Sequence, residues 1–253
     1  MKLRDYFHQV ARSMTVEDLW DAHVTQMRSY GFDRLIYGFT RYLGPNSLGD
    51  PADFVILSNH DPRYLDRFLN GGLYADAPMV RWALENEGAC SWSAMRNATP
   101  TTEEQKVLAF NESMNVTAGY SVSFKTTSSR AKGAIALTAR PGLSQQDVDA
   151  LWAMHGADIE LMNEIAHLKI MSLPHANPAR SLTDRQREAL EWVGDGKTTR
   201  DIALLMGLTP ATVEKHLRLA REALSVETTA QAVLKAAFAN QMFAIHSDRT
   251  GAD

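Results

Sequence analysis

The sequence predicts an α+β fold in two parts: an N-terminal α/β/α sandwich with a central antiparallel sheet, and a C-terminal all-α domain of four helices. In residues 1–172, strand-forming stretches lie between helical stretches, which favours a sheet covered on both faces. Residues 181–245 show helical spacing throughout. Residues 173–180 contain two prolines and no periodicity, so we interpret them as a linker, and residues 246–253 as a tail.

The first elements of the N-terminal part are a helix and two strands. Residues 14–30 have apolar side chains at helical spacing, and the inner side is formed by Leu19, Trp20, His23, Val24 and Met27. Residues 34–43 and 53–58 are rich in branched and aromatic side chains, which predicts strands. The stretch between them, with Gly, Asn, Ser and Pro, predicts a loop.

The remainder of this part continues the alternation. Residues 62–87 are helical with breaks at Gly71-Gly72 and Pro78, and residues 102–111 form a helix capped by Thr101 or Thr102. Two alternating stretches joined by a short turn predict antiparallel strands, namely 117–126 and 134–139. Ser144 then caps a long helix over residues 145–170.

Residues 198–224 contain two helical stretches joined by a glycine turn. Thr198 and Asp201 stand three residues apart, which is the capping-box spacing at a helix start. Gly207 ends this helix because glycine tolerates the left-handed conformation. The apolar positions expected on one face are Ile202, Leu205 and Met206.

The second helix of the pair starts at Thr209, a cap, followed by Pro210 at the first helical position. Its expected buried stripe is formed by Val213, Leu217, Ala220 and Leu224. Two short helices joined through glycine form the helix-turn-helix plan, in which the second helix enters the DNA major groove. A helix from Leu182-Thr183 to Gly194, and another over residues 230–244, flank the pair.

The C-terminal part resembles the four-helix DNA-binding domain of LuxR-type transcription regulators. The matching residues are Leu182, Thr183, Leu190, Gly196, Lys197, Thr198, Ile202, Ala203, Thr212, Val213, His216, Leu217, Leu224 and Val226. Gln186 and Glu214 depart from the family, which usually has a glutamate and a lysine there.

Several side chains on the second helix are candidates for DNA contact. Lys215, Arg218 and Arg221 lie off the buried stripe, and DNA contact is favoured over a merely solvated face. His216 either contacts DNA or packs near the turn. Thr209 and Thr212 are placed to bond phosphate through hydroxyl or backbone N–H groups, with capping as the competing role for Thr209. The predicted DNA-binding set is Thr198, Thr209, Thr212, Lys215, His216, Arg218 and Arg221.

An aromatic-rich stretch over residues 59–92 indicates either an apolar small-molecule pocket or ordinary core. This stretch resembles the acyl-homoserine-lactone-binding domain of the same family, with Trp92 and Pro78 at matching positions. The resemblance implies a ligand-binding set of His60, Tyr64, Phe68, Asp76, Met79, Trp92, Gly38 and Ala136.

The same stretch departs from the family where polar contacts to the ligand are made. Tyr64 stands in place of a tryptophan, and Ala77 in place of the aspartate that accepts a bond from the ligand amide. Asp76, one residue early, replaces that carboxylate only if the backbone shifts, since adjacent helical residues point about 100° apart. A mispaired buried polar group costs about 1–3 kcal/mol, so the ligand accepted is expected to change.

The amino-acid composition limits the classes of function that the chain can have. The net charge of −4 gives no global sign of nucleic-acid binding, and residues 179–245 contain nine basic and eight acidic side chains, so DNA affinity would depend on placement and dimerisation. The single cysteine, Cys90, cannot form an internal disulfide or a zinc site, which fits a cytoplasmic protein. No signal peptide, membrane span, cofactor motif or metal motif is evident. His60 and Cys90 as a catalytic pair are disfavoured against packing roles, so we do not expect an enzyme.

These observations predict a regulator that binds double-stranded promoter DNA as a homodimer and senses a small molecule such as an acyl-homoserine lactone. Dimerisation is expected to involve residues 230–244, with apolar Val233, Ala237 and Met242. Ligand and DNA sites would be coupled by about 1–3 kcal/mol. The alternatives are a ligand-independent regulator of the same type, or an N-terminal protein-interaction module.

Overall fold

The computed structural model describes residues 3–44, 47–96, 100–175 and 180–243. The chain divides into two compact units, Met1–Met171 and Ser172–Asp253, called here the first and second unit. Residues 176–179 of the expected linker and the expected tail 246–253 lie outside the described residues.

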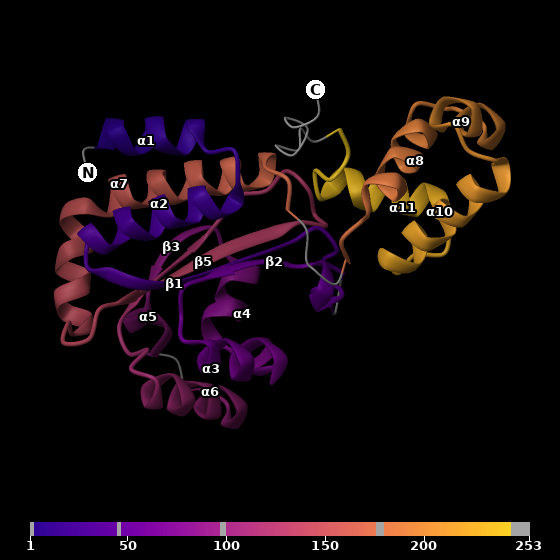
Figure 1. Ribbon diagram of the computed structural model, residues 1–253. Coiled ribbons are helices and arrows are strands. Elements are labelled where there is room, and N and C mark those ends of the chain that lie inside the picture. Colours follow the sequence, from indigo (N-terminus) through magenta and orange to yellow (C-terminus); the bar gives the residue numbers. More distant parts are fainter. Residues whose placement is uncertain (1–2, 45–46, 97–99, 176–179, 244–253) are drawn as a thin grey trace. The chain divides into compact units, whose positions relative to one another are not determined.

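The first unit is an α/β/α sandwich on a five-stranded antiparallel sheet, as the sequence predicts. The strands are β1 (Phe32–Thr40), β2 (Val55–Ser58), β3 (Gly88–Ser91), β4 (Gly119–Ser123) and β5 (Lys132–Ala139), in the order β2-β1-β5-β4-β3. One face carries α1 (Leu3–Arg12), α2 (Val16–Ser29) and α7 (Gln145–Ser172) (Figure 1). The other carries α3 (Pro62–Leu65), α4 (Pro78–Glu85), α5 (Trp92–Arg96) and α6 (Thr102–Ser113) (Figure 1).

Alternation along β1 separates a core on the α7 side from a second cluster on the α3–α6 side. On the α7 side, the Tyr37 hydroxyl lies 2.8 Å from Nδ1 of His167, whose ring stacks on Phe124. On the opposite side, Ile36 packs against a cluster of aromatic and apolar residues from the α3–α6 layer. This second cluster contains much of the predicted ligand-binding set.

Three elements of the first unit were not predicted: α1, β3 and α5. Residues 88–91, Gly-Ala-Cys-Ser, lack the branched and aromatic side chains typical of strands, and their pairing with β4 supplies the order instead. Helix α1 buries only Tyr6 and Val10, and the Tyr6 hydroxyl lies 2.7 Å from Nδ1 of His23. Tertiary contacts therefore specify these short elements.

The interrupted helical stretch has the breaks that were predicted. After α3, residues Asp66–Asn70 form a π-helical turn (η2), and Gly72 follows in the left-handed conformation with φ +77°. A 3-10 turn, Leu73–Asp76 (η3), then leads to Pro78 at the start of α4. These breaks allow the chain to fold back over the sheet.

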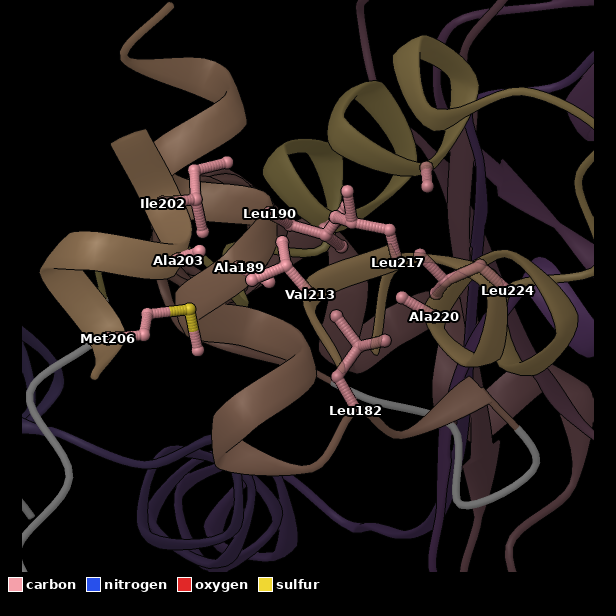
Figure 2. Close-up of a cluster of buried hydrophobic side chains, with 12 residues drawn as sticks. Leu182, Ala189, Leu190, Ile202, Ala203, Met206, Val213, Leu217, Ala220 and Leu224 are labelled. Atoms are coloured by element: carbon pink, nitrogen blue, oxygen red, sulfur yellow. The ribbon is translucent and has the colours of Figure 1, made fainter. Parts of the chain in front are cut away.

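The second unit consists of α8 (Asp184–Gly194), α9 (Thr199–Met206), α10 (Pro210–Ala223) and α11 (Thr229–Phe238). Helices α8, α9 and α11 each begin with a capping box. In α8 the box is formed by Thr183 and Gln186, and Gln186 is one of the departures from the family pattern. Gly207 ends α9 at φ +65°. Figure 2 shows the shared core, which includes Leu190, Ile202, Val213, Leu217, Ala220 and Leu224. The predicted stripe on α10 and the four-helix architecture are confirmed.

The expected inner face of α9 is wrong at one position. Leu205 is 52% exposed, whereas Ala203 is 4% exposed and belongs to the core. Successive residues turn by about 100°, so Ala203 and Leu205 lie on opposite sides of Ile202 and Met206. The neighbouring helices contact the Ala203 side.

The last helix is shorter than expected, and two of the residues expected at the dimer surface pack inward instead. Helix α11 ends at Phe238, and Ala244 lies outside the described residues. Val233 and Met242 pack against the core of their own unit. Ala237 is exposed, as is Leu234 at 53%.

Candidate ligand cavity and DNA-binding face

A cavity of about 140 Å³ lies on the α3–α6 side of the sheet of the first unit. Its walls come from β1, β2, β5 and α4, with η2 and η3 contributing Phe68 and Tyr74. The lining is almost entirely apolar, and Lys132 is its one charged side chain among the described residues. Such a space favours an apolar guest over water.

Four predicted ligand-binding residues line this cavity: Gly38, Phe68, Met79 and Ala136. The smallness of two of them creates the space, since Gly38 on β1 has no side chain and Ala136 on the adjacent strand β5 has only a methyl group. A Cβ added at Gly38 would lie 3.6 Å from Ile56 Cδ1, which is an ordinary contact and not a clash. A larger side chain at this position would therefore be tolerated by its neighbours and would occupy the cavity.

Two further predicted residues, His60 and Tyr64, are buried beside the cavity in a stack of rings. The centroids of His60 and Tyr64 are 4.5 Å apart, and those of Phe68 and Phe110 lie 5.4 Å from that of Tyr64. The Tyr64 hydroxyl donates to Asn111 Oδ1 at 3.1 Å. Burial raises the pKa of Tyr64, and burial with the nearby Arg34 cation lowers the pKa of His60 to about 4. Both rings are therefore neutral at pH 7.

Trp92 is buried at the edge of the same cluster, where it contacts the sheet directly. Its Nε1 donates to Ser121 Oγ at 3.0 Å, and Ser121 lines the cavity opposite Ala136. The indole lies over Gly119, where an added Cβ would stand 2.2 Å from the Leu137 carbonyl oxygen and 3.0 Å from the indole. Only glycine fits there.

Asp76 does not reach the cavity. It ends the 3-10 turn with an exposed side chain, while the next residue, Ala77, is fully buried in the cluster. The backbone shift needed to re-aim the carboxylate is absent, because Ala77 is the N-cap position of α4 and Pro78 fixes its start. The family position for an acceptor is thus occupied by a methyl group.

Three residues of this region, Asn111, Ser121 and Lys132, have roles that the sequence does not predict. Ser121 could be found by pairing, since it stands opposite Ala136 once β4 and β5 are aligned. Asn111 lies on α6, 47 residues from Tyr64, and no local pattern links them. Lys132 is the first residue of β5 and precedes the predicted start of that strand at residue 134.

The second unit presents the start of α10 with its caps in place. Thr209 Oγ1 accepts from the Thr212 backbone N–H at 3.2 Å, and the two hydroxyls lie 2.9 Å apart. Thr198 likewise serves as the cap of α9, and its hydroxyl donates to Asp201 at 2.7 Å. Thr198 and Thr209 are therefore helix caps, and Thr212 is hydrogen-bonded to Thr209. All three are exposed or half-exposed, which leaves the helix N-termini accessible.

The face of α10 opposite the core carries Lys215, Arg218 and Glu222. Arg218 pairs with Glu222, and both side chains are exposed, at 52% and 58%. Arg221 lies to one side and donates to Thr229 Oγ1 at 2.9 Å, which ties α10 to α11. His216 is half-buried on the opposite flank. Glu214, the departure from the family, accepts from the Thr199 hydroxyl at 2.8 Å.

Among the helices that the structure describes, none has the length and apolarity that crossing a bilayer requires. Within the described ranges, no cluster of three His, Cys, Asp or Glu side chains is placed to hold a metal ion.

An α/β/α unit with an apolar cavity, followed in the chain by a helix-turn-helix unit with cations on its second helix, is the arrangement of a DNA-binding transcription regulator. A family model for the autoinducer binding domain matches residues 15–170, and one for sigma-70 region 4 matches residues 179–224. The chain belongs to the autoinducer-binding, LuxR-type family of quorum-sensing transcription regulators.

Individual relatives agree with this assignment. The transcriptional activator LuxR of Aliivibrio fischeri is 23% identical over 196 residues, 76% of each chain. SdiA in complex with octanoyl-rac-glycerol matches with a TM-score of 0.53 and 16% identity, covering 94% of this chain and 93% of that one. An N-acylhomoserine lactone-dependent factor from Burkholderia cenocepacia has a TM-score of 0.53 and 17% identity, covering 67% and 94%. The curated relative is a transcriptional regulator, in agreement with the prediction that the chain is not an enzyme.

Proposed function

We propose that this regulator holds an acyl-chain signal, an acyl-homoserine lactone or a related amphiphile, in the cavity of the first unit. The observation that carries the proposal is an apolar cavity lined by Gly38, Phe68, Met79 and Ala136 at family ligand positions. The Burkholderia factor is described as N-acylhomoserine lactone-dependent, and SdiA is described with octanoyl-rac-glycerol, so both neighbours are associated with acyl compounds.

Few polar groups at the inner end of the cavity are placed to distinguish one ligand from another. Ser121 Oγ accepts from Trp92 and retains its own hydroxyl proton for a ligand carbonyl. The methyl group of Ala77 offers no acceptor for a ligand amide. A ligand whose amide N–H is buried here would leave it unpaired, at a cost of about 1–3 kcal/mol.

We propose further that α10 enters the major groove of promoter DNA. Lys215 and Arg218 would contact phosphates or base edges, because both are exposed on the outer face of that helix. Thr198, Thr209, Thr212 and His216 lie along accessible helix ends or flanks, suited to backbone contacts. Arg221 has a second role in holding α11, so its contribution to DNA affinity is expected to be smaller.

The active form is proposed to be a cytoplasmic homodimer with the domain boundaries 1–172, 173–180 and 181–245. Exposed Leu234 and Ala237 lie on one side of α11 and replace Val233 and Met242 as the expected contacts in the second unit. On α7, Met154, Leu161 and Leu168 are exposed at 72%, 43% and 67% with heptad spacing. Two symmetric copies would place their α10 helices on half-sites about one helical turn apart.

A ligand-independent regulator is the second candidate, and the size of the cavity favours it. About 140 Å³ is below the 300–1,000 Å³ that is usual for ligand pockets. A ligand would have to widen the space, for example by moving Tyr74 or Leu84, both of which line it.

The two candidates are separated by extracting the purified protein and identifying any bound small molecule by mass spectrometry, alongside selection of bound duplexes from a random pool. An acyl compound recovered in stoichiometric amount supports the sensor. A protein that selects a DNA sequence while yielding no compound, and that gains no thermal stability from added acyl compounds, supports the ligand-independent regulator. Failure to select any duplex would contradict both.

A further inference from the structure

We infer that the ligand of this cavity is an acyl chain ending in a carboxylate, a fatty-acid-like anion held by the ammonium group of Lys132. This inference rests on the proposed function and names the ligand class of the same cavity. Lys132 is the one charged side chain among the described residues that line an otherwise apolar space. A cation at the border of an apolar cavity matches an amphiphile with a single anionic end.

Lys132 stands where an anion could reach it from the cavity and from solvent. It begins β5 opposite Thr40, is half-buried, and its Nζ donates to the Asn86 carbonyl oxygen at 2.9 Å in an exposed hydrogen bond. An ammonium group carries three N–H donors, so two donors remain. No carboxylate of the described residues lies within 4.0 Å of Nζ.

The electrostatic setting favours an incoming anion. Burial lowers the pKa of Lys132, opposed by the nearby charge of Glu87. A half-buried cation with no carboxylate within 4.0 Å gains more from an added carboxylate than a fully solvated one does, and the Glu87 charge opposes part of this gain. Leu84, also in the lining, is 37% exposed, so the cavity reaches solvent at the end of α4 next to the Lys132 contact.

The inner end of the cavity offers a polar head group little beyond the Ser121 hydroxyl. The Tyr64 hydroxyl donates to Asn111, and the His60 ring lies 3.4 Å from the Thr138 hydroxyl. The Trp92 N–H is committed to Ser121. Apart from the Ser121 hydroxyl, the groups that face this end of the cavity are therefore rings and aliphatic side chains, which suit the apolar end of a chain. The polar end of the ligand therefore belongs at Lys132.

The test measures the affinity of the full chain for decanoate by isothermal titration calorimetry, with decanol as the uncharged probe of equal length. Lys132→Met removes the charge and keeps the apolar stem, Lys132→Arg keeps the charge, and Lys125→Met is the matched control, since Lys125 is exposed and does not line the cavity. We expect decanoate to bind Lys132→Met about tenfold or more weakly than the native protein, as for a charge-assisted hydrogen bond. Decanol should bind both alike, and Lys132→Arg and Lys125→Met should bind decanoate within about threefold of native.

Equal decanoate affinity in the native protein and Lys132→Met would overturn the inference. Retained decanol binding shows that Lys132→Met is folded. If that variant fails to fold, the native protein alone decides: decanoate should bind about tenfold more tightly than methyl decanoate, and equal or tighter binding of the ester would overturn the inference.

A third probe separates this inference from the proposed function. If decanoyl-homoserine lactone binds and decanoate does not, the carboxylate assignment fails while the acyl-signal sensor stands. If neither compound binds a protein that still binds DNA, both ligand assignments fail. If decanoate binds with the Lys132 dependence described and the lactone binds more weakly, both assignments are supported.

Discussion

Replacing Arg218 by alanine should weaken DNA binding in a way that depends on salt. A cation that neutralises one phosphate contributes about 0.9 to the slope of log affinity against log salt. A dimer has two copies of Arg218, so the slope should fall by about 1.8, and the loss of affinity between 50 and 200 mM salt should become about 12-fold smaller. The ion pair with Glu222 offsets little of this, since exposed pairs are worth about 0–1 kcal/mol.

The assay is fluorescence anisotropy on a selected duplex at three salt concentrations, with Lys106→Ala as the matched control. The Lys106 side chain is 63% exposed and is paired with Glu103 on α6. Its replacement by alanine removes the same charge, but from the first unit. Glu222→Gln should act in the opposite direction and tighten binding, because it releases Arg218 and removes an anion from the same face. An unchanged slope in Arg218→Ala, or an equal effect in Lys106→Ala, would show that this face of α10 does not contact DNA.

Three further predictions concern the first unit. Ala136→Leu should fill the cavity and abolish ligand-induced thermal stabilisation while leaving the DNA affinity of the ligand-free protein unchanged; a retained thermal shift would place the ligand elsewhere. Gly119→Ala should lower the free energy of unfolding by about 1–3 kcal/mol or more in urea titrations, because its Cβ would stand 2.2 Å from the Leu137 carbonyl oxygen, and a native-like midpoint would contradict this geometry. Burial lowers the pKa of His23 to about 4, so below its unfolded pKa of about 6.5 the unfolded state takes up the proton first. Stability should fall between about pH 6.5 and pH 4, by about 3 kcal/mol from this group, and a flat profile of urea midpoints across that range would refute the assignment.

The helix-turn-helix unit was predictable because its signals are local. Caps such as Thr198 and Thr209, the left-handed Gly207 and the stripe from Val213 to Leu224 all act within a few residues of one another. The error at Leu205 arose where local spacing allows two faces, and only the neighbouring helices decide between them. Likewise, the apolar spacing of Val233 and Met242 suggests a dimer surface, and only their packing within the second unit shows that they belong to its core.

The ligand side was predictable only in outline, because its contacts join distant segments. Gly38, Phe68, Met79 and Ala136 reach the cavity as the resemblance implied. The hydrogen bonds of Tyr64 with Asn111 and of Trp92 with Ser121 cross 47 and 29 residues and could not be derived from spacing.

The short elements follow the same rule. Strand β3 has a weak local signal and gains its order from β4, and the exposure of Asp76 follows from the 3-10 turn that precedes α4. Departures from a family pattern therefore mark positions whose contacts change, while the packing of distant segments determines which side chain faces the cavity.

The most direct test of the account is the affinity for a selected duplex, measured at constant salt with and without saturating acyl ligand. Coupling between the two sites of about 1–3 kcal/mol predicts a change of about 5- to 150-fold. The same ligand should change nothing in Ala136→Leu. A native protein that binds the ligand saturably, yet binds DNA with the same affinity in both states, would contradict the claim that occupation of this cavity controls α10.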